Sequence, residues 1–279
     1  MENPTMENPN MDKNFKFSVL GKTNLKVGRL GLAGSYGAPA IAYEKAFENG
    51  CNYFYSGSGR RRSQMKQAVK NLVNQGQREK MVISVQTYAR FGVMTETWFK
   101  QSLAGMGIDH ADILMLGWHN NTPSNRLMDF ALGMQEKGLC RFIGISGHNR
   151  SLFPKLLEKK KFDLFHIRYN PAHRGGQKEC FPLVENDGAP GLVTYTATRW
   201  GHLLQEKHMP SGESPLSARD CYRFSLSDPR VNICLCGPKN MDQMKTALSA
   251  LDKGPLTPAE TERITRIGDH VHKTAKGFF

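Results

Sequence analysis

The chain has 279 residues, with 38 Lys and Arg against 25 Asp and Glu, which gives a formal net charge of +13. Its 39% hydrophobic and 23% charged residues are typical of a globular protein and exclude a collagen, a coiled coil or a disordered chain. No apolar run approaches the roughly 18 residues of a membrane span, and the amino end lacks the basic-then-apolar pattern of a secretion signal. We therefore expect a soluble, cytoplasmic protein without a membrane partner.

The six cysteines are widely spaced, without C-x-x-C pairs or the density of a disulfide scaffold. They predict free thiols and no metal site. The basic clusters at residues 60–62 and 159–161 are short and lack interleaved aromatic residues, so nucleic-acid binding is not expected. The positive charge then favours solubility or an anionic small-molecule substrate.

Residues 1–14 repeat the unit MENP and are predicted to be disordered, which leaves a folded domain over residues 15–279. From Phe15, alternating apolar and polar residues around positions 21–24 predict a hairpin that leads into a buried strand at Leu30–Leu32. Seven later apolar runs predict further strands, each buried on both faces. These runs are Asn52–Tyr55, Val82–Gln86, Asp112–Leu116, Phe142–Ser146, Leu164–Arg168, Leu192–Thr196 and Asn232–Cys236.

Amphipathic stretches between these runs predict helices. Cap signals stand before two of these helices, at Thr122-Pro123 and Asn149-Arg150, and after one of them, at Gly138. Eight strand–helix units over about 250 residues are typical of a single (β/α)8 TIM barrel of the α/β class. The predicted helices are Arg61–Asn74, Thr95–Met106, Pro123–Lys137, Ser151–Lys160, Ser217–Ser227 and Met241–Leu251, followed by an extra carboxy-terminal helix at Thr257–His272.

The active site of such a barrel lies at the carboxyl ends of its strands. The residues that end the predicted strands are rich in aromatic, amide, histidine and arginine groups and include no carboxylate. This composition predicts a neutral or cationic mouth suited to an anionic or phosphate-bearing ligand. The candidate substrate-binding residues are Arg168, Arg199, Trp118, His148 and Tyr36.

Several segments resemble the successive strand-end signatures of the aldo-keto reductase superfamily, from about Phe15 to Leu251. They read LGKTNLKVGRLGLAG, GCNYFYSGS, SLAGMGIDHADILML, GLCRFIGIS, FHIRYNP and ICLCGPKN. The last part is similar to a branch whose members often carry an appended iron–sulfur domain, but no cysteine quartet follows, so no iron–sulfur cluster is expected. The resemblance implies a barrel that binds NADP(H) and reduces carbonyl compounds.

The resemblance also implies a catalytic tetrad of aspartate, tyrosine, lysine and histidine, and all four positions are substituted. The aspartate falls on Tyr55 and the tyrosine on Arg60. The lysine falls on Gln86, and the histidine on Gly117, two positions before His119. Gln86 cannot supply the cation that lowers the pKa of a tyrosine, and arginine is not a useful proton donor. Standard carbonyl-reductase chemistry is therefore not expected, and the candidate catalytic residues are His119, Tyr55 and Gln86.

For three candidate site residues, the sequence leaves two interpretations open. The usual pKa of histidine suits His119 to proton transfer at neutral pH, or the side chain is held by a loop hydrogen bond. Tyr55 either donates a hydrogen bond into the mouth or is a structural aromatic residue at its rim. Arg168 recognises a carboxylate or phosphate, or it belongs to a structural ion pair, because a half-buried arginine needs a partner.

The resemblance implies positions that contact the cofactor NADP(H). His166 stands where the family has a glutamine at the nicotinamide, and Ser146 is retained, whereas Gly147 replaces the asparagine that follows. Tyr195 matches the aromatic residue that stacks under the nicotinamide, and Thr196 matches a serine that contacts phosphate. A helix start after the last strand offers backbone N–H groups to a phosphate. Its candidate residues are Gly237, Lys239 (for the 2′-phosphate) and Asn240.

The sequence thus predicts a divergent enzyme of the aldo-keto reductase type. It would be an oxidoreductase that acts with NADP(H) on a small carbonyl or alcohol compound, with an anionic one favoured, through a non-standard acid/base group. Two alternatives stay open. One is a non-redox enzyme, such as a lyase, dehydratase or isomerase, that uses no nicotinamide. The other is a catalytically silent protein that binds a small molecule. The oligomeric state stays open as well.

Overall fold

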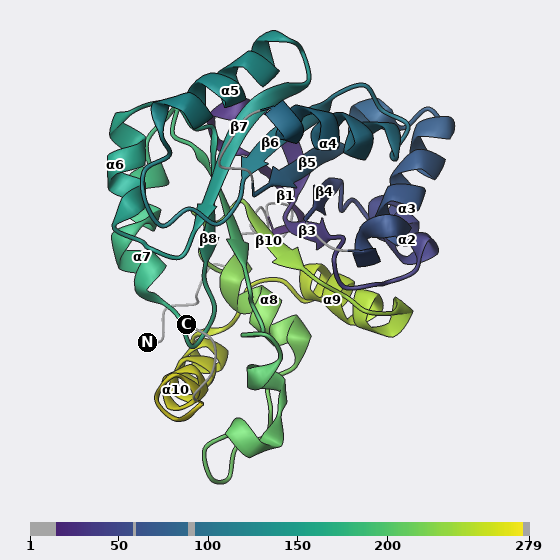
Figure 1. Ribbon diagram of the computed structural model, residues 1–279. Helices are drawn as coiled ribbons and strands as arrows, with labels where there is room; N and C mark the ends of the chain where they lie inside the picture. The colour runs from purple at the N-terminus through teal and green to yellow at the C-terminus, as the bar shows by residue number, and fades with distance from the viewer. Residues whose placement is uncertain (1–14, 58–59, 89–92, 276–279) are drawn as a thin grey trace, which may run out of the picture.

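The computed structural model describes residues 15–57, 60–88 and 93–275, so the predicted disordered segment 1–14 lies outside the described residues. Eight parallel strands form a closed barrel in the order β10-β3-β4-β5-β6-β7-β8-β9, with helices around it (Figure 1). The predicted α/β barrel is confirmed. The strands are β3 (Leu30–Ala33), β4 (Tyr53–Ser56), β5 (Val82–Thr87), β6 (Ala111–Leu116), β7 (Cys140–Gly147), β8 (Leu164–Arg168), β9 (Gly191–Tyr195) and β10 (Ile233–Cys236).

The predicted hairpin is present before the barrel. Strand β1 (Phe17–Val19) pairs antiparallel with β2 (Lys26–Gly28), and the short helix η1 (Gly21–Thr23) lies in the turn between them. Leu20 is completely buried and packs against Gly191, the first residue of β9, and against the apolar interior of the barrel. The hairpin therefore closes the amino-terminal end of the barrel and leaves the carboxyl ends of the strands for a site.

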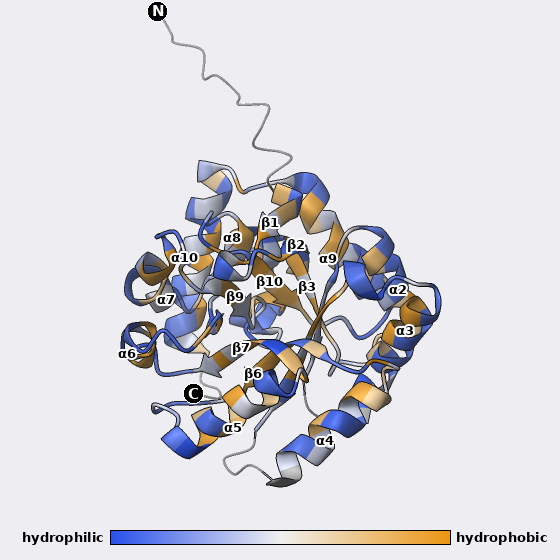
Figure 2. Ribbon diagram, turned by 90° about the horizontal axis from the view of Figure 1, so that it is seen from above, coloured by the Kyte–Doolittle hydropathy of each residue, from blue (hydrophilic) through white to orange (hydrophobic). Residues whose placement is uncertain are grey.

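The helices turn apolar faces toward the strands and polar faces outward (Figure 2). All seven predicted helices are present, with shifted ends, and the structure adds α2 and α7. Ser124 is the N-cap of α5, because its hydroxyl accepts a hydrogen bond from the Leu127 N–H; the start predicted at Thr122-Pro123 is too early. The helices are α2 (Ala40–Glu48), α3 (Ser63–Asn74), α4 (Val93–Ala104), α5 (Asn125–Glu136), α6 (Leu152–Glu158), α7 (Gly175–Glu179), α8 (Ala218–Leu226), α9 (Met241–Lys253) and α10 (Pro258–Thr274).

The helix predicted from Ser151 begins one residue later, at Leu152. Ser151 precedes the first residue of α6, and both its N–H and its hydroxyl donate to the Asn149 side-chain oxygen (3.3 and 2.9 Å). Asn149 therefore binds the turn that leads into the helix, because its short side chain accepts hydrogen bonds from backbone two residues on.

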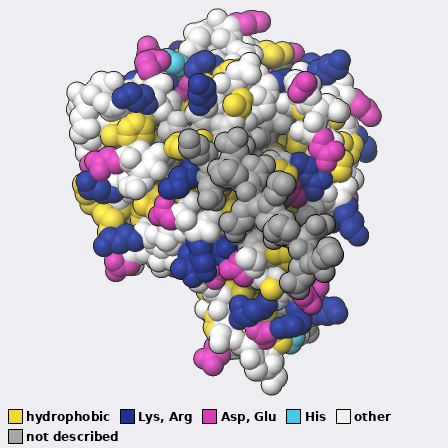
Figure 3. Space-filling view, turned by 180° about the vertical axis from the view of Figure 1, so that it is seen from behind, with side chains coloured by type: hydrophobic (Ala, Val, Ile, Leu, Met, Phe, Trp, Pro, Cys, Tyr) yellow, Lys and Arg dark blue, Asp and Glu magenta, His cyan; other side chains and the backbone are white. Residues whose placement is uncertain are grey.

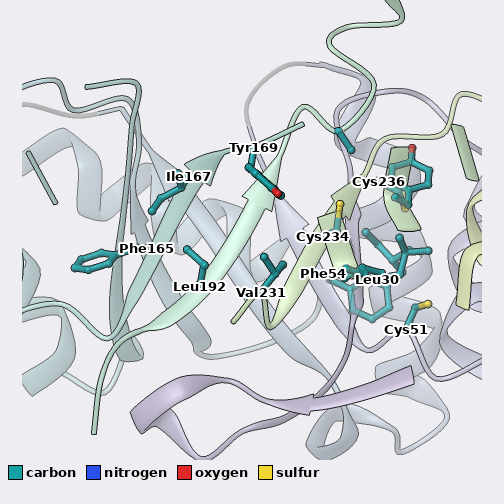
Figure 4. Packing of buried hydrophobic residues seen from close by; sticks show 14 of the residues in the cluster. Leu30, Cys51, Phe54, Phe165, Ile167, Tyr169, Leu192, Val231, Cys234 and Cys236 are labelled. Carbon is teal, nitrogen blue, oxygen red and sulfur yellow. The ribbon is translucent and has the colours of Figure 1, made fainter. Parts of the chain in front are cut away.

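Apolar side chains pack in two layers, one inside the barrel and one between the strands and the helices. Figure 4 shows part of the outer layer, to which Phe165 and Ile167 of β8 and Leu192 of β9 belong. Because side chains alternate along a strand, His166 and Arg168 point to the other face of β8, toward the inside of the barrel. This alternation brings polar groups of several strands to one end of the barrel.

A buried arginine joins α8 to the start of α10. Arg223 is 2% exposed and makes two hydrogen bonds to the Glu260 carboxylate (2.7 and 2.9 Å). Its guanidinium also donates to the carbonyl oxygens of Gly254 and Pro255, each at 2.8 Å. Hydrogen bonding to Arg223 lowers the pKa of Glu260 to about 2. The carboxylate in turn completes a capping box with Thr257 at the start of α10.

We expect the substitution Arg223→Met to lower the free energy of unfolding at pH 7 by about 3 kcal/mol, because it leaves a carboxylate and two carbonyl groups without their donor. Urea unfolding measures this change. The difference from the unchanged protein should shrink as the pH falls from 4.5 toward 2, since protonation of Glu260 removes the ion pair in both proteins.

The matched control is Arg266→Met, which breaks a surface ion pair with Glu213 in which the arginine is 64% exposed. It should cost less than about 1 kcal/mol. Equal losses for the two variants would contradict a structural role for the buried arginine.

Candidate functional site

A cavity of about 500 Å³ opens at the carboxyl ends of the barrel strands. This volume lies within the range of small-molecule sites. Most of the residues predicted from the sequence line it, and they come from β3 through β10 and the loops that follow. They are Tyr36, Tyr55, Gln86, Trp118, Ser146, His148, His166, Tyr195, Thr196 and Gly237.

Other lining residues were not chosen as site residues from the sequence. Ser35 and Tyr88 also line the cavity, and both follow predicted strands closely enough for their position to have indicated it. Trp200 lies in the loop after β9, beyond the predicted strand end. The sequence feature that could have indicated Trp200 is an aromatic residue next to Arg199. Only the path of the loop brings the side chain to the cavity. Ala33, Gly57, Leu235 and Cys236 complete the lining.

None of the described residues that line this cavity carries an amine, a guanidinium or a carboxylate. Burial raises the pKa of Tyr55 well above 10, with a further contribution from the nearby phenol of Tyr88. Burial also raises the pKa of Tyr195, and burial, with the Arg168 charge adding to it, lowers the pKa of His148. These groups are therefore all neutral near pH 7, and the cavity offers aromatic faces and hydroxyl groups rather than charges.

His166 lines the cavity from β8. Its Nε2 lies 3.0 Å from the Tyr53 hydroxyl, and its ring centroid lies 5.3 Å from that of Tyr55. The side chain is 1% exposed, and burial lowers its pKa to about 3. The imidazole is thus neutral at physiological pH. In the tautomer in which Tyr53 donates to Nε2, the Nδ1 carries the proton and is a hydrogen-bond donor.

The end of β7 orients three aromatic rings at the mouth. The His148 ring makes edge-to-face contacts with Trp118 (6.4 Å between centroids) and with Tyr195 (5.9 Å). The Tyr195 hydroxyl donates to the Gly147 carbonyl at 3.0 Å, and the Ser146 hydroxyl oxygen accepts from the backbone N–H of Trp118 at 3.0 Å. The ring contacts, together with the hydrogen bond of the Tyr195 hydroxyl, therefore preorganise these rings for a ligand.

His119 and Arg168 do not line this cavity. His119 is 5% exposed and lines a second cavity, of about 550 Å³, together with neighbours between Trp118 and Leu127. Arg168 ends β8 half-buried, where burial lowers its pKa and the nearby phenol of Tyr195 raises it. The structure thus brings Tyr55 and Gln86 together but not His119 with them.

Arg199 is 4% exposed and serves the carboxy-terminal helix. Its guanidinium donates to the carbonyl oxygens of Val271, at the end of α10, and of Ala275, the latter at 2.7 Å. Carbonyl groups at the end of a helix lack partners within it, and a cation there is favourable. The side chain that the sequence analysis assigned to the substrate therefore anchors a loop to α10.

The start of α9 is occupied by its own side chains. The Asn240 side-chain oxygen accepts from the Gln243 N–H, and the Gln243 side-chain oxygen accepts from the Lys239 N–H, both at 2.9 Å. Asp242 adds a negative charge in the first turn. The Lys239 and Asn240 side chains lie outside the cavity lining and are exposed. These contacts leave fewer N–H groups for a phosphate than the sequence analysis expected.

Comparison with known proteins decides the family. The profile of the aldo/keto reductase family matches residues 38–221, which is more than half of the chain. The chain belongs to the aldo/keto reductase family. The holo form of the aldo-keto reductase AKR11C1 from Bacillus halodurans is 19% identical, with a TM-score of 0.74 over 90% of this chain and 96% of that chain. An aldo/keto reductase from Klebsiella pneumoniae in complex with NADP and acetate is 16% identical, with a TM-score of 0.74 over 91% and 95%.

Two glycines of this aldo/keto reductase stand where the resemblance places functional side chains. A Cβ at Gly117 would lie 2.4 Å from the Gln86 amide nitrogen, so the histidine expected there requires Gln86 to move. A Cβ at Gly147 would lie 2.0 Å from the His119 carbonyl oxygen. Because that oxygen belongs to the backbone, no asparagine fits at position 147 in this conformation.

Within the described part of this aldo/keto reductase, no three His, Cys, Asp or Glu side chains gather as metal ligands would. Across the same residues, no helix combines the length and the apolar character that crossing a membrane requires.

The neutral His166 makes stability depend on pH. The unfolded chain binds a proton near pH 6.5 and the folded chain only near pH 3, so between these values the unfolded state binds more protons. The free energy of unfolding should therefore decrease as the pH falls below 6.5. Replacing His166 by Gln should reduce this slope by about one proton, or about 1.4 kcal/mol per pH unit. Urea unfolding of both proteins between pH 4 and 7 measures it, and identical slopes would contradict a neutral buried imidazole.

Proposed function

We propose that this aldo/keto reductase is a nicotinamide-dependent oxidoreductase that reduces the carbonyl group of a small, uncharged compound, with the Tyr55 phenol as proton donor. The observation that carries this proposal is the position of Tyr55. Its side chain lines the cavity at the carboxyl ends of the strands, and its phenol is protonated at neutral pH. A protonated donor at the mouth of the barrel is what the reduction of a carbonyl needs.

The charge of the lining supports an uncharged substrate. The sequence analysis expected Arg168 and Arg199 to hold an anion, but Arg199 binds carbonyl oxygens at the end of α10 and neither arginine lines the cavity. An anion placed among neutral phenols and imidazoles would lose its hydration without gaining an ion pair with a residue of the lining. We therefore assign the cavity to a neutral carbonyl compound.

Several lining residues fit a nicotinamide. Tyr195 offers a flat ring held by its hydroxyl, and the Ser146 hydroxyl, which accepts from Trp118, still has its own proton to donate to a carboxamide oxygen. The Klebsiella pneumoniae relative was solved with NADP. When bound, the nicotinamide supplies a hydride. Lys239, exposed at the start of α9, would offer its ammonium group to a phosphate.

The chain's own contribution is the proton. Tyr55 donates a hydrogen bond to the carbonyl oxygen and then transfers its proton as that oxygen becomes an alkoxide, which is a stronger base than a phenolate. The carbonyl compound gains one hydride and one proton and becomes an alcohol, and water restores the proton of Tyr55.

The first test is the substitution Tyr55→Phe. Titration with NADPH, followed by nicotinamide fluorescence and by thermal shift, should give the same dissociation constant for the variant and the unchanged protein. Reduction of uncharged aldehydes and ketones by NADPH should fall by about 100-fold or more in kcat/KM, because the proton donor is lost. The control is Tyr169→Phe, since Tyr169 is 2% exposed and packs against Phe181 and Phe224.

No NADPH binding at millimolar concentration would overturn the redox proposal. Equal activity of the Tyr55 variant would overturn the assignment of the proton donor alone. The uncharged lining also favours a second candidate, a protein that binds a neutral small molecule without turnover. Ligand binding with no consumption of NADPH would support that candidate.

The pH dependence provides an independent prediction. The pKa values of Tyr55 and Tyr195 are raised and those of His148 and His166 are lowered, so none of these four groups changes charge between pH 7 and 9. We expect kcat/KM for reduction to stay constant within about twofold over this range. Steady-state rates in buffers of constant ionic strength measure it. A titration step within the range would mean that another group donates the proton.

A further inference from the structure

Another cavity lies at the end of the barrel opposite the candidate active site. Its volume is about 310 Å³, at the lower end of the range of small-molecule sites. The residues that line it belong to the end of α6, to the segments that lead into β8 and β9, and to the hairpin turn. It therefore opens at the amino-terminal ends of the strands, and we call it the amino-terminal cavity. It shares no lining residue with the cavity that contains Tyr55.

The hairpin turn forms one fixed wall of the amino-terminal cavity. The Lys22 N–H donates to the Ala189 carbonyl at 2.8 Å, and the Lys22 ammonium lies 3.1 Å from the Asp163 carboxylate. A Cβ at Gly21 would lie 2.3 Å from the backbone nitrogen of Gly191, so the turn packs directly on the start of β9. Because backbone contacts hold this wall, the cavity is preorganised for a ligand.

The floor of the amino-terminal cavity is apolar. Leu156 is completely buried and Phe162 is 2% exposed, and both line the cavity. Leu157 and Leu183 are partly buried and pack against the same core. Such a floor gains free energy when a ligand's apolar group replaces the water on it.

The rim of the amino-terminal cavity carries one unpaired charge of each sign. Lys160 and Asp187 are both exposed and line the cavity, and within the described ranges neither lies within ion-pair distance of an opposite charge. Lys160 has a φ of 53° at the second position after α6, where a helix usually ends on glycine. A lysine there places an ammonium group at the rim. Asn186 adds an amide that can donate and accept hydrogen bonds.

We propose that the amino-terminal cavity binds a free α-amino acid with an apolar side chain. The ligand carboxylate meets the ammonium group of Lys160, the ligand ammonium group meets the carboxylate of Asp187, and the apolar side chain covers the floor. A ligand with a carboxylate alone would face the like charge of Asp187, and an amine alone would face that of Lys160. The zwitterion is the small ligand that pairs both charges at once.

Four ligands separate the three contacts. L-Leucine makes all of them, 4-methylpentanoate is leucine without its amino group, and 3-methylbutylamine is leucine without its carboxyl group. L-Serine keeps both charges and lacks the apolar side chain. Titration of isotope-labelled protein, followed by the NMR signals of the Lys160 and Gly188 N–H groups, gives each dissociation constant. We expect about 1 mM for L-leucine and values about fivefold or more higher for the other three.

The run of lysines at 159–161 offers a matched control. Lys159 and Lys160 are adjacent and exposed, but only Lys160 lines the cavity. Lys160→Gln and Asp187→Asn should each weaken binding of L-leucine by about fivefold. Lys159→Gln and Glu158→Gln change exposed charges outside the lining and should leave it unchanged. Asp187→Asn should also tighten binding of 4-methylpentanoate, because the like charge is removed.

Several results would overturn the amino-acid site. They are the absence of a saturable shift up to about 20 mM L-leucine, equal binding of any of the other three ligands, or unchanged affinity in both the Lys160 and the Asp187 variants. Thermal unfolding of each variant checks that the fold is retained, which the exposed positions lead us to expect. The titrations need neither NADPH nor turnover, so their outcome is independent of the proposed reduction of a carbonyl compound.

Discussion

Alternation of side chains along parallel strands in a closed ring decides which groups meet at the mouth of this protein. On β4, Phe54 packs outward under the helices, whereas Tyr53 belongs to the barrel interior and Tyr55 lines the cavity. On β8 the same parity directs His166 inward. The hydrogen bond between Tyr53 and His166 and the contact between the rings of His166 and Tyr55 follow from this geometry. Such contacts join residues more than a hundred positions apart without any help from the loops.

This constraint explains how far the sequence could predict the site. Strand positions are set by burial and parity, so the apolar runs place Tyr55 and Gln86 at strand ends, whereas the site roles of His166 and Tyr195 came from the resemblance to the family; all four line the cavity. This alternation of side chains ends where the strand ends, so it does not place residues in the loops. Trp118 adopts a left-handed φ directly after β6, which turns the chain so that His119 lines a different cavity. No property of the His119 side chain could have predicted this, because the handedness of one backbone residue decides it.

Contacts between residues far apart in the chain set a second limit on what the sequence could predict. The guanidinium of Arg199 binds carbonyl groups 72 and 76 residues later in the chain, and local sequence contains no sign of that partner. Arg223 likewise binds Gly254, Pro255 and Glu260, which lie beyond α9. Lys and Arg on one face of the molecule are interspersed with Asp and Glu (Figure 3). The net charge of +13 therefore does not predict the charge of the cavity lining, since some arginines are bound to backbone carbonyls and others lie at the surface.

The replaced tetrad positions are sterically linked. Gly117 leaves space that the Gln86 amide fills, so a histidine at 117 would require the Gln86 side chain to move. At Gly147 the obstacle is the His119 carbonyl oxygen, which follows from the left-handed turn at Trp118. Trp118 itself lines the cavity at the mouth. The conformation that leaves no space for an asparagine at 147 is therefore also the one that carries an aromatic side chain of the lining.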